Sequence, residues 1–171
     1  MVNSGVFPAF NGTVSAYSIG TGGSLTQLSL SPFPAGIDSL SVAITPLVPF
    51  ASSFAKLEIA KHSFDLKESF TLGATSNGIN PLTENVILQI GTFSVAIPAG
   101  SFKKIPHRRF AFEGVIDGVS LDVQIVPLGN NIFTFKAEGT GANFTGLTNP
   151  VTVVLTIGIN TGSTTVTAQF R

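Results

Sequence analysis

Few side chains of this chain have the types and spacing that chemistry requires, and three carboxylates are the clearest set. Glu113, Asp122 and Glu138 fall in three consecutive segments in which apolar and polar residues alternate. Counting outward from the turns between these segments places Glu113 opposite Asp122, and Asp122 opposite Glu138, on neighbouring strands. Like charges directly opposite each other destabilise a sheet, so the row predicts a bound cation, raised carboxyl pKa values, or relief by a neighbour such as Lys136.

Two kinds of site would use such a row. Calcium binds about six to eight oxygen ligands, so loop carbonyls or water would complete a calcium site. Carboxyl groups about 5 to 9.5 Å apart also serve as acid and base in glycoside hydrolases. The plainer interpretation is a solvated polar face that binds nothing. Calcium is therefore the one cofactor that the sequence suggests, and only under the first interpretation.

A basic segment at residues 103–109 holds a second set of candidate ligands. Its basic side chains are Lys103, Lys104, His107, Arg108 and Arg109. Together they would attract a phosphate, a sulfated glycan or an acidic partner. Because Pro106 interrupts the segment, we expect a loop or the edge of a sheet, where charges also discourage unwanted strand pairing. Both interpretations stay open.

The composition excludes several other classes of function. The chain has no cysteine, so it has no thiolate metal site and no cysteine nucleophile, and its two histidines are not at metal-ligand spacing. Nine Lys and Arg balance nine Asp and Glu, so no overall positive charge attracts nucleic acid, and we expect no nucleic-acid partner. The aromatic residues are 15 Phe and one Tyr, without Trp, so the usual platforms for sugar binding are missing. We expect a protein that is not an enzyme.

The elements that would position these residues are β-strands. From Phe54 onward, apolar residues recur at every second position in segment after segment, a pattern typical of half-buried antiparallel strands. The sequence predicts an all-β fold: an antiparallel β-sandwich, Greek-key or jelly-roll-like, over residues 52–171. Residues 1–51 form a separate segment of low charge, because Asp38 is the only charged residue before Lys56. Short strands are expected there at residues 14–19 and 39–44.

Turn residues fix the register of the strands that carry the carboxylates. Asp117-Gly118 is a favoured two-residue turn, and it pairs Ile116 with Val119. A three-residue loop, 129–131, places Ile125 opposite Phe135. A last hairpin is expected between residues 153–157 and 166–170, with its turn at 159–162, which would make the C-terminus a core strand.

Residues 11–46 resemble one repeat of the YVTN, lactonase-like β-propellers. The resemblance rests on 11–19 (NGTVSAYSI), 22–26 (GGSLT), 31–36 (SPFPAG) and 41–43 (SVA). It implies a blade-like unit but no catalytic residue, since propeller chemistry draws on several blades around a channel. The remainder, through 97–102 (IPAGSF) and 112–118 (FEGVIDG), is similar to uncharacterised β-rich modules of bacterial surface or secreted proteins.

These observations favour a non-catalytic structural or adhesive module, extracellular or on the cell surface. The nearly uncharged N-terminal segment suggests self-assembly by strand addition, so the expected partners are further copies of the chain or another surface protein. A cation-dependent ligand-binding or glycan-active domain using the carboxylate row is the alternative. The most apolar window, residues 42–51, is too short to span a bilayer and contains two prolines. Residues 1–8 have no basic region like that of a signal peptide.

Overall fold

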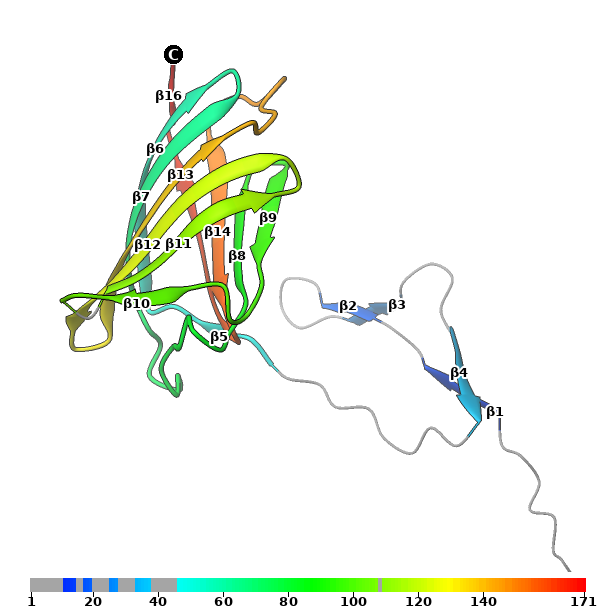
Figure 1. Ribbon diagram of the computed structural model, residues 1–171. Helices are drawn as coiled ribbons and strands as arrows, with labels where there is room; N and C mark the ends of the chain where they lie inside the picture. Colours follow the sequence, from blue (N-terminus) through cyan, green and yellow to red (C-terminus); the bar gives the residue numbers. More distant parts are fainter. Residues whose placement is uncertain (1–10, 15–16, 20–24, 28–32, 38–45, 108) are drawn as a thin grey trace, which may run out of the picture. The chain divides into compact units, whose positions relative to one another are not determined.

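A computed structural model describes residues 11–14, 17–19, 25–27, 33–37, 46–107 and 109–171. All of the regular elements in these ranges are β-strands. The chain divides into two compact units, Met1–Ile44 and Thr45–Arg171. In the second unit two sheets pack against each other, which confirms the predicted β-sandwich (Figure 1).

The N-terminal unit contains two small antiparallel pairs. β1 (Asn11–Val14) pairs with β4 (Phe33–Ile37), and β2 (Tyr17–Ile19) pairs with β3 (Leu25–Gln27). Of the strand predicted over residues 14–19, Val14 lies in β1 and Tyr17–Ile19 form β2, and residues 15 and 16 lie outside the described residues. The strand predicted at residues 39–44 lies outside the described residues.

The larger sheet of the sandwich has seven strands. In spatial order they are β10 (Lys103–Ile105), β11 (Arg109–Ile116), β12 (Val119–Gly129), β13 (Ile132–Thr140), β7 (Ser63–Thr71), β6 (Ser52–Ala60) and β16 (Gln169–Phe170). Every pair is antiparallel except β16 with β6, which is parallel. The strands from β11 to β6 curve over the smaller sheet (Figure 1).

The smaller sheet has five strands. In spatial order they are β5 (Val48–Pro49), β15 (Asn160–Val166), β14 (Val151–Ile157), β8 (Val86–Ile90) and β9 (Phe93–Ile97). β5 runs parallel to β15, and the other pairs are antiparallel. Both sheets are therefore mixed, although the sequence pattern suggested antiparallel pairs alone. Through β5, residues 48 and 49 belong to the sandwich.

The predicted register of β11, β12 and β13 is confirmed. Ile116 pairs with Val119 around the Asp117-Gly118 turn, and Ile125 pairs with Phe135. The second turn differs in detail, because Gly129 pairs with Ile132 and leaves only Asn130 and Asn131 in the loop, both with positive φ. A bulge between Pro127 and Gly129 absorbs the extra residue, and so the register is the one that a three-residue loop would give.

The predicted last hairpin was wrong. The chain turns earlier, at residues 158 and 159, so that Ile157 pairs with Asn160 and Val151 pairs with Val166. The C-terminal residues then leave this sheet and form β16 beside β6, where Phe170 is 47% exposed. The sequence pattern missed β15 because its inward positions hold Asn160, Gly162 and Thr164 rather than large apolar residues.

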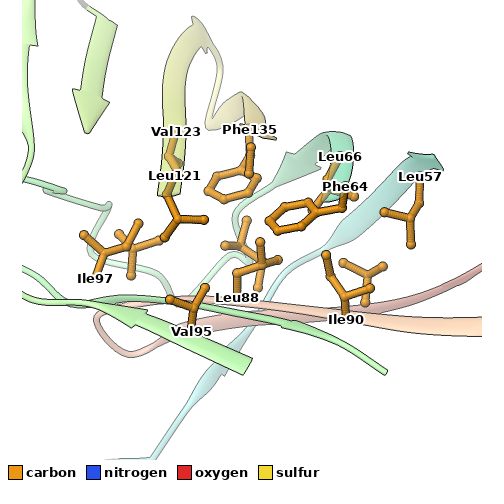
Figure 2. Packing of buried hydrophobic residues seen from close by; sticks show 14 of the residues in the cluster. Leu57, Phe64, Leu66, Leu88, Ile90, Val95, Ile97, Leu121, Val123 and Phe135 are labelled. Carbon is orange, nitrogen blue, oxygen red and sulfur yellow. The ribbon is translucent and has the colours of Figure 1, made fainter. Parts of the chain in front are cut away.

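The core lies between the two sheets. Large side chains such as Leu66 and Phe135 from the seven-stranded sheet point toward Leu88 and Ile90 of the five-stranded sheet (Figure 2). All four are at most 2% exposed. Every residue of this core lies between residues 57 and 168, so the second unit contains a complete hydrophobic core of its own.

Candidate functional site

The carboxylate row lies on the outer face of the seven-stranded sheet and is longer than predicted. Glu113 pairs with Asp122, and Asp122 pairs with Glu138, as the sequence indicated. The row then continues onto two strands from earlier in the chain, since Glu138 pairs with Asp65 and Asp65 pairs with Glu58. Five carboxylates therefore cross five neighbouring strands, which lie about 4.8 Å apart in a sheet.

Cations on the same face relieve the repulsion in this row. Lys136 Nζ lies 2.5 Å from Glu138 Oε1, and Lys67 Nζ lies 3.5 Å from Asp65 Oδ2. The guanidinium of Arg171 forms an ion pair with Glu58. The hydrogen bond and the charge of Lys136 lower the pKa of Glu138. Of the three outcomes predicted for the row, relief by a neighbouring cation is the one found at Glu138.

The sequence also suggested that the three carboxylates Glu113, Asp122 and Glu138 of this row bind calcium. In the part of the chain that the structure describes, no three Asp, Glu, His or Cys side chains are grouped so as to hold a metal ion. Glu113 and Asp122 face each other on the sheet, while Glu138 is engaged by Lys136. The structure does not test the sequence-based hypothesis that Glu113, Asp122 and Glu138 bind calcium, and titration with calcium tests it.

The basic segment, residues 103–109, lies at the edge of the seven-stranded sheet that β10 forms. Lys103 and Lys104 belong to β10, the edge strand, and alternate residues of a strand point to opposite faces. Arg109 begins β11 and its Nε–H donates to the carbonyl oxygen of Pro106 at 3.3 Å. His107 lies between them with φ of 65°, and Arg108 lies outside the described residues. The predicted edge position is confirmed, and the two lysines do not converge on one ligand.

Two neighbouring segments of the chain each cross from one sheet to the other, and no sequence pattern indicated the gap between them. The first runs from β5 to β6 and the second from β15 to β16, each passing from the five-stranded to the seven-stranded sheet. They are hydrogen-bonded at the start, where Phe50 N–H donates to Thr161 O at 2.6 Å. They are bonded again at the end, where Arg171 N–H donates to Ile59 O at 2.9 Å.

Between these two contacts no backbone pairing joins β6 to β15, although Cα atoms of the two strands lie within 8 Å of each other. The resulting hollow, of about 480 Å³, is lined by residues 54–58 of β6 and by residues 164–167 and 169. We call this opening the β6–β15 seam. Leu57 and Val166 line it from the core side, while Phe54, which is 73% exposed, lines it from outside.

The seam exposes the backbone of two strand edges. The carbonyl of Ile59 points away from β7, because it accepts from Arg171, and alternate residues along a strand repeat that direction. Ser53 and Ala55 therefore direct their N–H and C=O groups toward the seam. On β15, Thr161 O accepts from Phe50, so the backbone groups of Ser163 and Thr165 likewise point away from β14.

Behind the seam lies a buried carboxyl group. Glu68 is only 3% exposed and sits on the inner face of β7, directly opposite Ala55. The hydroxyl of Ser53 donates to Glu68 Oε1 at 2.5 Å, while Oε2 is buried without a hydrogen-bond partner. Ser53 lies in residues 52–57 of β6, which form an edge of the sheet because β16 pairs only with Glu58 and Ile59. Burial raises the pKa of Glu68 to about 7, and the Ser53 hydrogen bond opposes part of that rise. Glu68 stands at an apolar position of the alternation, which was the signal available in the sequence.

The fold and these surfaces define a two-sheet β-sandwich with a row of surface ion pairs and an open seam. No family model, curated protein or solved structure matches the chain. A membrane-crossing helix would have to be long and apolar, and the described ranges contain none.

Proposed function

We propose that this chain is a non-catalytic structural or adhesive module of a secreted or cell-surface protein, and that it assembles with further copies by strand addition at the β6–β15 seam. The observation that carries the proposal is the pair of open strand edges at the seam. Unpaired backbone groups on an edge strand are a template for another strand. The added strand pairs with Ser163 and Thr165 of β15, where β5 no longer pairs with that edge, since its partners are Asn160 and Thr161.

The strand comes from the N-terminal segment of a second copy. Residues 39–44 alternate polar or small residues with Leu40, Val42 and Ile44, and they carry no charge. Six residues of strand span about 20 Å, and the open stretch of β15, residues 162–166, spans about 17 Å. The apolar side chains of the added strand would face Leu57 and Val166, and no charge would be buried.

Substituting Thr165→Pro tests the pairing. Proline lacks an N–H group, and the N–H of Thr165 points away from β14, so the substitution blocks an added strand while the β14–β15 pairing is kept. Thr165→Ser keeps the donor and is the matched control. In light scattering at micromolar concentration, the parent chain and Thr165→Ser are expected to be oligomeric and Thr165→Pro monomeric.

Deleting residues 1–44 tests the donor. The remaining chain keeps the whole hydrophobic core and is expected to fold as a monomer. A truncated chain that stays as oligomeric as the parent would exclude the N-terminal segment as the added strand. A parent chain that is monomeric at these concentrations would exclude self-assembly altogether.

A further inference from the structure

We propose that Glu68 is a proton-operated lock on the β6–β15 seam: its protonated form keeps the unpaired edge of β6, residues 52–57, closed over the core, and loss of the proton opens the seam to water. The lock acts on β6 itself, whether or not strands are added there. Its role as a regulator of assembly rests on the proposed function.

The position of the carboxyl group ties it to the edge strand. Glu68 is directly opposite Ala55, which lines the seam, and its Oε1 accepts the hydrogen bond of Ser53 two residues away on the same edge strand. On its far side from the seam lies Phe135, which is 1% exposed. Ala55 of β6 lies between Glu68 and the seam, so displacement of β6 gives water a path to the carboxyl group.

No counter-charge compensates Glu68 inside the sandwich. Within residues 46–107 and 109–171, Glu68 and Asn160 are the buried polar side chains, and Asn160 bonds to Ser76 and to the carbonyl of Gly78. On its own strand and on β13 and β6, the flanking charges Lys67, Lys136 and Lys56 occupy alternate positions and lie on the outer face.

The inner positions of β15 across the seam are equally neutral. They hold Asn160, Gly162, Thr164 and Val166, and the inner residues of β14 are Val151, Val153, Leu155 and Ile157.

The proton has one place to reside in the closed form. Because Ser53 donates to Oε1, the acid proton sits on Oε2, which has no acceptor in the interior. Ionisation releases this proton to bulk water and leaves a buried carboxylate with one hydrogen bond. A buried charge without a partner is strongly unfavourable, and hydration through the seam removes the penalty.

Hydrogen exchange of the full-length chain tests the lock. The pKa of Glu68 is about 7 in the closed form and its ordinary value is 4.5. The opening constant of β6 should therefore rise by about tenfold per pH unit from pH 5 toward pH 7, beyond the intrinsic pH dependence of exchange, and level off above pH 7. The amides of Phe54 and Lys56, which point toward β7 and are protected by that pairing, report on the opening of β6, and those of β12 serve as an internal reference.

Two variants separate the lock from a general loss of stability. Glu68→Gln and Glu68→Leu cannot ionise, so the corrected exchange of the Phe54 and Lys56 amides should not change with pH in either. Glu138→Gln, on the outer face of the same sheet, should behave as the parent chain. An equal pH response in the Glu68 variants, or in the amides of β12, would overturn the lock. Assembly has no part in this readout at low concentration, so the lock and the proposed function fail separately.

Discussion

Glu68 and Glu138 lie on neighbouring strands of one sheet, and the two faces of that sheet give their carboxyl groups opposite properties. Glu138 faces outward, and Lys136 holds its pKa below the ordinary value. Glu68 faces inward, and burial holds its pKa at about 7. The residue type is the same. Its position in the alternation therefore decides whether its surroundings stabilise or destabilise the charged form of the carboxyl group.

The comparison also separates the two regions as candidate sites. In the outer row, Glu58, Asp65 and Glu138 form ion pairs with basic side chains on the same face. Exposed ion pairs of this kind contribute little to stability. The inner carboxyl group has no ionic partner and sits behind an open strand edge. A single proton on Glu68, in the nearly uncharged interior, is therefore expected to affect stability more than a proton on the outer row.

The largest expected effect is a pH dependence of stability that Glu68 creates. The pKa of Glu68 is raised in the folded chain, so the folded state binds the proton more tightly than the unfolded state. Stability is then greatest below pH 4.5 and falls as the pH rises toward 7. From pH 5 to pH 8 the loss should be about 2.5 kcal/mol, at 1.36 kcal/mol for each pKa unit. Urea unfolding at the two pH values measures it.

Two substitutions test whether Glu68 causes this pH dependence. Glu68→Gln removes the titrating group, and its unfolding free energy should lose this dependence on pH. Glu138→Gln should keep it, because the pKa of Glu138 is lowered and its contribution changes below pH 4.5, outside the window. If Glu68→Gln loses as much stability between pH 5 and pH 8 as the parent chain, another group is responsible and the contrast between the two faces is wrong.

The sequence determined the register of the central strands but not the seam. Phe112, Val123 and Phe135 mark the inner face at every second position, and turn residues fixed their pairing. Two positive φ values and a bulge at residues 127–129 replaced the three-residue loop without changing that pairing. Strong alternation and favoured turns are local signals, so both can be recognised without the tertiary structure.

The seam depends on tertiary contacts that leave no alternating pattern. Gly162 occupies an inward position of β15 because the ring of Phe50 lies against it, and a Cβ there would approach Phe50 Cδ2 to 2.1 Å. Phe50 in turn stacks on Phe70, with ring centroids 4.4 Å apart. An aromatic ring from a distant segment replaces the local apolar residue, so β15 has no apolar pattern of its own. The parallel pairings of β5 with β15 and of β16 with β6 also could not be recognised in the sequence, because β5 and β16 have only two residues each.

A smaller effect is expected on the outer face. Lys136→Ala removes the hydrogen bond and the charge that lower the pKa of Glu138, so that pKa should rise toward its ordinary value. Lys136 also lies near Asp65 and Asp122, which add to the rise in its own pKa. Carboxyl chemical shifts followed by NMR through an acid titration measure the change at Glu138. A Glu138 pKa that stays low in Lys136→Ala would mean that another group, such as Lys67, controls the row.

The smallest expected effect concerns calcium at the carboxylate row. Lys136 already neutralises Glu138, and Glu113 and Asp122 alone supply too few oxygens for a cation that binds about six to eight. Calorimetric titration with calcium should therefore give no saturable heat for the parent chain or for Asp122→Ala. Lys136→Ala is the sharper variant, since it frees Glu138 for a metal. Saturable binding by the parent chain that Asp122→Ala abolishes would establish the row as a calcium site and give the outer face the functional role assigned here to the seam.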